Sequence, residues 1–220
     1  MNIIKNPDHA IASIIFINDD SNEYTEELIL NLNKISDVYV FINKKSNIDP
    51  NKYSHLLPIK GYKYSKSSSK YNSLELYSMI KYILKVIDYH ERYIILGDIG
   101  DKISSERIKD SIFNVFKSII TKSILNLKII DHELRKELYS KKKTLIFNKL
   151  DISGINITHK SINDIYYLSK SDVSRICGYL SSDNKYLDTF KDINFNYFLP
   201  SIVEKLEIDY MNSDILNIDI

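Results

Sequence analysis

Short apolar runs alternate along the chain with longer segments in which apolar residues recur at helical spacing. Residues 10–17 form an almost wholly apolar run rich in β-branched residues, which is typical of a strand buried on both faces of a sheet. Leu28, Leu32 and Ile35 then recur at helical spacing, and residues 37–42 predict a second strand. Strand, helix and strand in close succession predict a βαβ unit with parallel strands and a right-handed crossover.

The same patterns predict elements along the rest of the chain. We expect strands over residues 56–60, 92–97, 144–147, 155–158 and 165–168, and helices over residues 72–87, 104–127 (as one or two helices), 131–143, 170–181 and 194–206. No internal repeat and no interdomain linker interrupts this order. We therefore expect a single Rossmann-like α/β domain over residues 1–220, with a mixed, mostly parallel sheet flanked by helices.

Composition narrows the class of protein. The chain has 220 residues, 44% of them hydrophobic, which is enough for one sizeable core. Lys plus Arg is 30 against 29 for Asp plus Glu, and this balance gives no general attraction to nucleic acid or anionic membrane. The bias toward Ile, Asn, Lys and Tyr is typical of an AT-rich coding genome. Without a signal-peptide pattern or a long apolar run, we expect a cytoplasmic protein with no membrane span.

Cysteine and histidine usage argues against two kinds of site. Cys177 is the single cysteine, so an intrachain disulfide and a multi-cysteine zinc site are excluded. Its apolar helical context predicts a buried small side chain and not a nucleophile. The five histidines are scattered without metal-ligand spacing, which argues against zinc catalysis.

Two carboxylates follow the predicted strand 92–97. Asp98 and Asp101 stand where ligands bind in open α/β sheets, outside the carboxyl ends of strands, and carboxylates there can hold a divalent cation. Gly97 and Gly100 would let the backbone approach a ligand. A second interpretation stays open, because Asp and Gly also commonly form the turn that ends a strand.

Three further groups of polar residues are candidates. Asn18 and Asp19 follow the first strand, where a nucleotide commonly lies, although they also suit the start of a helix. Asp192 precedes the last predicted helix and could act as a general base or as a favourable helix charge. Asp164 could accept hydrogen bonds from two hydroxyl groups, and Tyr166 could stack on a ligand or pack in the core.

Four segments, taken in order, carry a resemblance to a known family. They are Tyr71-Asn-Ser-Leu74, Arg92-Tyr-Ile-Ile-Leu-Gly-Asp98, Asp164-Ile-Tyr-Tyr-Leu-Ser-Lys-Ser-Asp172 and Lys191-Asp192-Ile193. They resemble the Tyr-x-Asn-Leu helix start, the Asp-x-Asp strand end, the Gly-Gly-Tyr-Val-Leu-Ser-x-Asp segment and the Glu-Asp-Val of GT-A glycosyltransferases of the β-1,3-galactosyltransferase and Fringe-like group. The resemblance covers roughly residues 70–210. The chain departs from it in having Asp-Ile-Gly-Asp for Asp-x-Asp, no paired glycines, and Lys191 for the acid.

The resemblance implies an enzyme that moves a sugar from a nucleoside-diphosphate donor to a hydroxyl group of a glycan or another acceptor. Asp98 and Asp101 would hold Mn²⁺ or Mg²⁺, and Asp192 would be the general base. The nucleotide-binding half would cover about residues 10–101, and the acceptor half about residues 144–210.

By the same resemblance, Asn18 and Asp19 would lie near the nucleotide, and Asp164 and Tyr166 would shape the donor or acceptor pocket. Two alternatives remain open. One is a non-catalytic α/β module, such as a degenerate transferase that binds a nucleotide or a protein. The other is a Rossmann-like methyltransferase. Residues 14–22 contain no glycine that would let the backbone approach a cofactor, and this argues against that alternative. The sequence specifies no oligomeric state.

Overall fold

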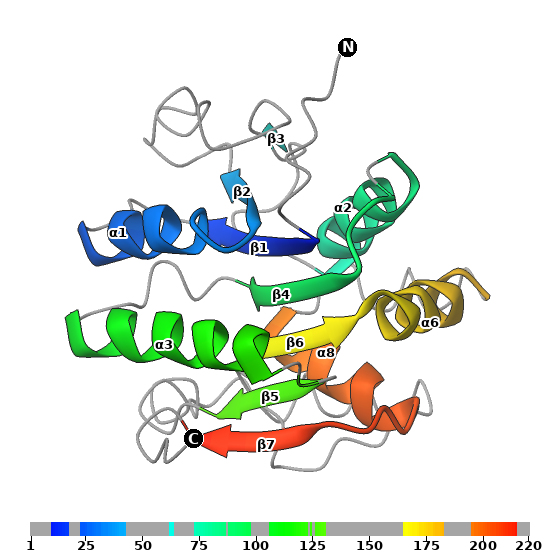
Figure 1. The fold of residues 1–220 in the computed structure, drawn as a ribbon. Coiled ribbons are helices and arrows are strands. Elements are labelled where there is room, and N and C mark those ends of the chain that lie inside the picture. Colours follow the sequence, from blue (N-terminus) through cyan, green and yellow to red (C-terminus); the bar gives the residue numbers. More distant parts are fainter. Residues whose placement is uncertain are drawn as a thin grey trace, which may run out of the picture.

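A mixed β-sheet, with helices on both of its faces, forms the core of this α/β protein (Figure 1). The computed structural model describes residues 10–17, 23–42, 62–63, 73–86, 88–97, 106–122, 124, 126–130, 165–182 and 195–214. The strands are β1 (Ile11–Ile17), β2 (Asp37–Ile42), β3 (Tyr62–Lys63), β4 (Arg92–Gly97), β5 (Leu127–Ile130), β6 (Ile165–Ser169) and β7 (Met211–Asp214). The helices are α1 (Glu23–Leu32), α2 (Ser73–Val86), α3 (Glu106–Lys122), α6 (Lys170–Ser181) and α8 (Phe195–Lys205).

The predicted βαβ unit lies between β3 and β4 in the sheet. Strand β1 pairs in parallel with β2 on one side and with β4 on the other, and Ile14 is the register partner of both Tyr39 and Ile95. Ala12 and Ile14 point to the opposite face from Ile11 and Ile15, and all four are buried. The apolar run of β1 is therefore explained by burial on both faces, as the sequence predicted.

One strand reverses the direction of the sheet. The order is β3-β2-β1-β4-β6-β5-β7, and β6 is antiparallel to both of its neighbours, β4 and β5. Strands β5 and β7 pair in parallel. The carboxyl ends of β1, β2, β4, β5 and β7 therefore meet at one edge, where β6 begins. We call this the carboxyl edge, and the other end of the strands the amino edge.

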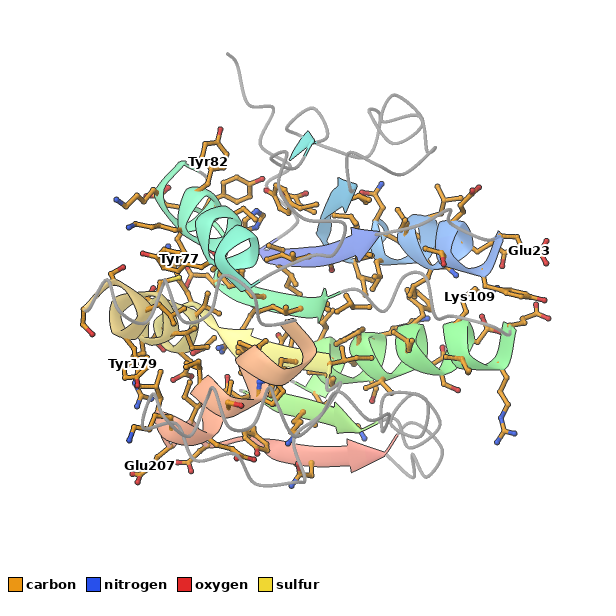
Figure 2. The ribbon with its side chains drawn as sticks, turned by 180° about the vertical axis from the view of Figure 1, so that it is seen from behind. Glu23, Tyr77, Tyr82, Lys109, Tyr179 and Glu207 are labelled. Carbon is orange, nitrogen blue, oxygen red and sulfur yellow. The ribbon has the colours of Figure 1, made fainter. Side chains whose placement is uncertain are left out.

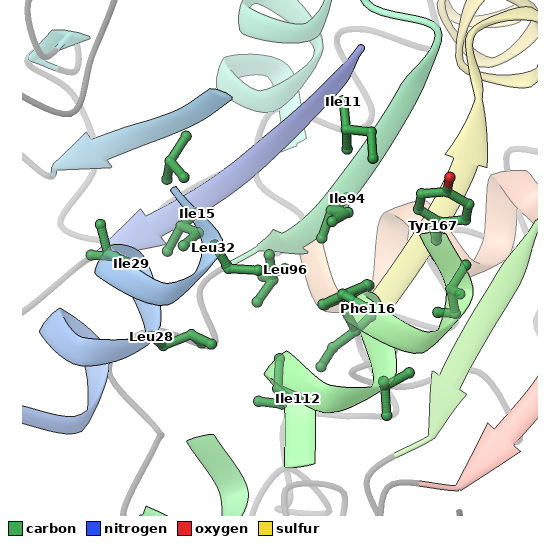
Figure 3. Close-up of a cluster of buried hydrophobic side chains, with 14 of the residues drawn as sticks. Ile11, Ile15, Leu28, Ile29, Leu32, Ile94, Leu96, Ile112, Phe116 and Tyr167 are labelled. Carbon is green, nitrogen blue, oxygen red and sulfur yellow. The ribbon is translucent and has the colours of Figure 1, made fainter. Parts of the chain in front are cut away.

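The two faces of the sheet have separate helices (Figures 1 and 2). Helices α1 and α3 pack on one face, where Leu28, Ile29 and Leu32 of α1 and Ile112 and Phe116 of α3 form an apolar cluster with the strands (Figure 3). Helices α2, α6 and α8 lie on the other face. None of the helices in the described part of the chain has the length and hydrophobicity needed to cross a bilayer.

Cys177 lies on the inward face of α6, as its apolar context predicted. Its side chain is buried, and burial raises the pKa of the thiol to about 12. The thiol is therefore protonated at neutral pH, which removes the thiolate that nucleophilic chemistry requires.

The sequence patterns missed three strands. A helix was predicted over residues 104–127, but α3 ends at Lys122, and Leu127–Ile130 forms β5. A short apolar run cannot be assigned to helix or strand by its periodicity, and here pairing with β6 and β7 decides. Strands β3 and β7 were not predicted either. The elements predicted over residues 56–60, 131–143, 144–147 and 155–158 lie outside the described residues.

Phe116 provides a test of the core between α3 and the sheet. Because this side chain is fully buried, the substitution Phe116→Ala should lower the free energy of unfolding by about 3–5 kcal/mol, measured by urea denaturation. Lys117→Ala, at the exposed next position of the same helix, is the matched control and should stay within about 0.5 kcal/mol of the wild type. A loss below about 1 kcal/mol for Phe116→Ala would contradict this packing.

Candidate functional site

Strand β4 ends at the carboxyl edge in a bulge. Ile14 of β1 pairs with Ile95, but the next residue, Ile15, pairs with Gly97, so Leu96 is an extra residue in β4. Bulges are common near active sites, where they change the direction of the side chains that follow. The irregularity therefore lies immediately before the position at which the sequence continues with Asp98.

Three neighbouring strands bring predicted site positions to this edge. Strand β1 ends at Ile17, β4 ends at Gly97, and β6, between β4 and β5, begins at Ile165. In the sequence, Asn18 follows the first of these, Asp98 the second, and Asp164 precedes the third. These residues, together with Asp19, Asp101 and Asp192, lie outside the described residues, so their roles stay predictions.

Tyr166 is the one predicted site residue within the described part of the chain. It is the second residue of β6 from the carboxyl edge, and its side chain is buried at 0% exposure. Its ring packs edge-on against Tyr210, with ring centroids 6.3 Å apart. Tyr166 therefore belongs to the interior beneath the edge, and its predicted part in shaping a pocket stays a prediction.

A buried lysine that the sequence patterns did not identify lies beside Tyr166. Lys128 of β5 is the register partner of Tyr166, so the two side chains share one face of the sheet. Lys128 is 4% exposed, and its Nζ lies 5.2 Å from the centroid of the Tyr210 ring and 3.5 Å from its hydroxyl oxygen. A cation over an aromatic face is stabilised by the ring quadrupole. Lys128 was missed because a helix was predicted up to residue 127.

Lys109, in the first turn of α3, contacts the middle of α1. The Lys109 ammonium donates a hydrogen bond to Glu27 of α1 and lies 3.4 Å from Asp110 and 4.0 Å from Glu106 within α3. The hydrogen bond to Glu27 raises the pKa of Lys109 above its ordinary value, so the side chain is charged at neutral pH. Figure 2 shows Lys109 at the same end of the molecule as Glu23.

The amino edge contains a buried polar cluster between the starts of β2 and β4. Nε2 of His90 lies 2.7 Å from the Tyr39 hydroxyl and 3.6 Å from an Asp37 carboxylate oxygen, and Tyr89 donates a hydrogen bond to the same carboxylate. His90 is fully buried, and burial raises the pKa of the Tyr39 hydroxyl. The Tyr39 hydroxyl, the Asp37 carboxylate and Nε2 of His90 contact one another, which suits a structural role.

A second polar cluster at the amino edge surrounds the start of α6. Ser169 is the N-cap, and its hydroxyl accepts a hydrogen bond from the amide of Asp172 and donates one to its carboxylate, at 3.2 Å and 2.6 Å. Asn126, which precedes β5, donates to the same carboxylate at 2.9 Å, and Arg175 donates to it at 3.1 Å. The segment Ser169-Lys-Ser-Asp172, which was compared with the family's Ser-x-Asp, therefore forms a helix cap in this chain.

A pocket of about 440 Å³ lies beside this cap. Its lining combines the cations Arg92 and Lys170 with Glu91 and three serines, Ser169, Ser171 and Ser174. The cap already occupies the helix N-terminus, and the pocket lies at the amino edge, whereas β1 and β4, which Asn18 and Asp98 follow in the sequence, end at the carboxyl edge. It is therefore not the candidate site.

Comparisons with known proteins do not assign the chain to a family. No protein-family model matches the chain, and no curated protein matches it. Within the described ranges, no three His, Cys, Asp or Glu side chains are grouped so that they could hold a metal ion. The candidate site is thus the carboxyl edge at β1, β4 and β6, defined by strand register and by the neighbouring sequence.

The Asp172 cluster predicts how stability depends on pH. Burial tends to raise the pKa of the Asp172 carboxyl, but the hydrogen bonds from Ser169, Asn126 and Arg175 together outweigh burial and lower it. A carboxyl whose pKa is lower in the folded state stabilises the fold above its unfolded pKa, about 3.9, and this contribution is lost as the pH falls through the folded value.

Asp172→Asn should therefore melt below the wild type at pH 7, and the gap in Tm should narrow as the pH falls below about 4. Thermal melts followed by circular dichroism from pH 7 to pH 3 measure this gap. Asp209→Asn, at an exposed position of the same edge, is the control and should follow the wild type. A gap for Asp172→Asn that stays constant with pH would show that the carboxylate charge is not what stabilises the cap.

Proposed function

We propose that this chain is a GT-A-type glycosyltransferase that moves a sugar from a nucleoside-diphosphate donor to a hydroxyl acceptor. The observation that carries the proposal is the meeting of the ends of β1 and β4 with the start of β6 at one edge. The sequence beside these ends contains Asn18, Asp98 and Asp164. Ligands of open α/β sheets bind outside the carboxyl ends of the strands, so polar residues at adjacent ends are available to one ligand.

The strand order supports the same class of fold. In a dinucleotide-binding sheet of order 3-2-1-4-5-6, the strands after β4 follow in sequence order. Here β6 is inserted antiparallel between β4 and β5, and β7 is added beyond β5. A mostly parallel sheet in which the sixth strand is antiparallel and lies between the fourth and the fifth resembles the sheet of GT-A glycosyltransferases.

The proposed chemistry assigns one task to each group of residues. Asn18 and Asp19 would bind the nucleotide, and Asp98 and Asp101 would hold Mn²⁺ or Mg²⁺, whose charge offsets that of the departing nucleoside diphosphate. Asp192 would take the proton of the acceptor hydroxyl as its oxygen attacks the anomeric carbon.

The buried side chains beneath the edge would support this site without contacting the donor. Tyr166 and Lys128 lie side by side on one face of the sheet, and both are held against Tyr210. Tyr166 is 0% exposed and Lys128 is 4% exposed. Sites built over rigid, well-packed strands keep reacting groups in position more accurately than sites supported by loops alone.

Ligand binding tests the proposal directly. The melting temperature of the wild type should be measured with UDP, GDP, CMP and their sugars, each with and without Mn²⁺. A nucleotide present at about 100 times its Kd stabilises by about 2.7 kcal/mol, which raises the Tm of a chain of this size by roughly 5–10 °C. Asp98→Ala should lose the metal-dependent part of the shift, whereas the exposed control Asp209→Ala should keep it. If no ligand shifts the wild type, the non-catalytic module becomes the better interpretation.

The base is tested separately from binding. Asp192→Asn should retain the nucleotide-dependent shift in Tm but release nucleoside diphosphate from the bound donor about 10²–10⁴ times more slowly, because a positioned base contributes that much to the rate. Release of the nucleotide can be followed by a coupled enzymatic assay, with Asp209→Asn as the control. An unchanged rate in Asp192→Asn would remove Asp192 from the mechanism.

A further inference from the structure

The pocket of about 440 Å³ at the amino edge is lined by two segments that lie far apart in the sequence. The lining residues are Glu91 and Arg92, at the start of β4, and Ser169, Lys170, Ser171 and Ser174, at the start of α6. Arg92 and Ser169 are register partners in the sheet. The amide of Lys170 also donates a hydrogen bond to the Glu91 carbonyl at 3.0 Å, so the two segments are fixed against each other. The volume lies within the range of roughly 300–1,000 Å³ that small-molecule sites occupy.

Two half-buried cations line the pocket, and each is held in place by a neutral group. The Lys170 ammonium donates a hydrogen bond to the backbone carbonyl oxygen of Asp88. Arg92 lies beside the Tyr167 hydroxyl: burial raises the pKa of Tyr167, and the charge of Arg92 and a hydrogen bond from it oppose that rise. In the described part of the chain, neither cation forms an ion pair with a carboxylate. Both therefore keep their positive charge available at the wall of the pocket.

The acidic groups near the pocket do not cancel this charge. The carboxylate of Asp172 belongs to the cap, where it accepts hydrogen bonds from Ser169, Asn126 and Arg175. The Arg175 cation balances its charge, and neither Asp172 nor Arg175 lines the pocket. Glu91 does line it, but its side chain is exposed, and water screens an exposed charge more than a half-buried one. Two cations against one carboxylate leave the lining positive.

Hydroxyl groups on the first turns of α6 complete the lining. Ser171 and Ser174 are three residues apart, so they share one face of the helix, and both are exposed. The amide of Asp172 is already bonded to the cap, so side chains and not the helix end supply the donors of the pocket. A planar guanidinium, an ammonium and several hydroxyl groups together suit the oxygens of a phosphate group.

We propose that this pocket is a binding site for a small phosphate monoester. The guanidinium of Arg92 would bind two phosphate oxygens, and Lys170 would contribute a point charge. The hydroxyls of Ser171 and Ser174 would donate to the remaining phosphate oxygens, and the rest of the pocket would hold the organic part of the ligand. The site is distinct from the carboxyl edge, because β4 begins at Arg92 and runs to that edge. It therefore stands apart from the proposed function.

Isothermal titration of the full chain, without added metal, tests the site. The probe is ribose 5-phosphate, and ribose and inorganic phosphate represent its two halves. Ribose 5-phosphate should bind more tightly than inorganic phosphate, and ribose should not bind. Arg92→Gln and Lys170→Gln should each weaken binding of the probe about tenfold or more, because each removes a charged hydrogen bond. Glu91→Gln should strengthen it about two- to fivefold, because a like charge leaves the pocket.

Matched controls place the probe in this pocket. Lys122→Gln removes the same charge from an exposed position at the end of α3 and should bind the probe as the wild type does. Asp98→Ala should also bind it as the wild type does, because the carboxyl edge takes no part. Lys170 is half-buried at the helix surface, so Lys170→Gln tests the pocket even if Arg92→Gln fails to fold.

Weaker binding in Lys170→Gln together with stronger binding in Glu91→Gln supports the phosphate site. Three results would overturn it. One is that the wild type does not bind the probe, and another is that Asp98→Ala loses it, which would place the probe at the carboxyl edge. The third is that inorganic phosphate binds as tightly as the probe or that all variants bind alike, which would mean an adventitious ion only. The proposed function is tested with nucleotides and Mn²⁺, so it can fail or stand separately.

Discussion

The antiparallel insertion of β6 between β4 and β5 is the constraint on which the rest of the structure depends. Strand β4 has β1 on one side, and its remaining backbone groups need a partner inside the core, which β6 supplies. Because β6 runs in the reverse direction, its end at Ser169 leads directly into α6 at the amino edge, and its start at Ile165 comes to the carboxyl edge. The same pairing attaches β5 and β7, so the two halves of the chain share one sheet.

The described residues make polar contacts at both edges of the sheet. At the amino edge, Asp37 and His90 link the starts of β2 and β4, and Asn126 and Asp172 link β5 to α6. At the carboxyl edge, Lys109 of α3 donates a hydrogen bond to Glu27 of α1, and the predicted site residues Asn18 and Asp98 come directly after the ends of β1 and β4 in the sequence.

Much of the fold was predictable because the relevant signals are local. The apolar run of β1 and the helical spacing of α1, α2, α6 and α8 identified these elements within a few residues. The candidate site followed from order alone, since Asn18, Asp98 and Asp164 stand next to strand ends in the sequence. Lys128 was not predictable, because β5 has only four residues and its strand identity comes from its neighbours in the sheet. Tyr166 was also proposed as a site residue from its local sequence alone. Its burial depends on tertiary contacts, because Tyr210 and Lys128 pack beside it from other parts of the chain.

The sequence by itself determined the strands β1, β2, β4 and β6 and the helices α1, α2, α6 and α8, and it also encoded the Ser169–Asp172 cap, because both partners lie within one helical turn. Only the tertiary structure decided the direction of β6, the strand identity of β5, and the pairing of Lys109 with Glu27, which are 82 positions apart. The physical reason is that periodicity records which face of an element is buried. It carries no information about which other element covers that face or in which direction that element runs.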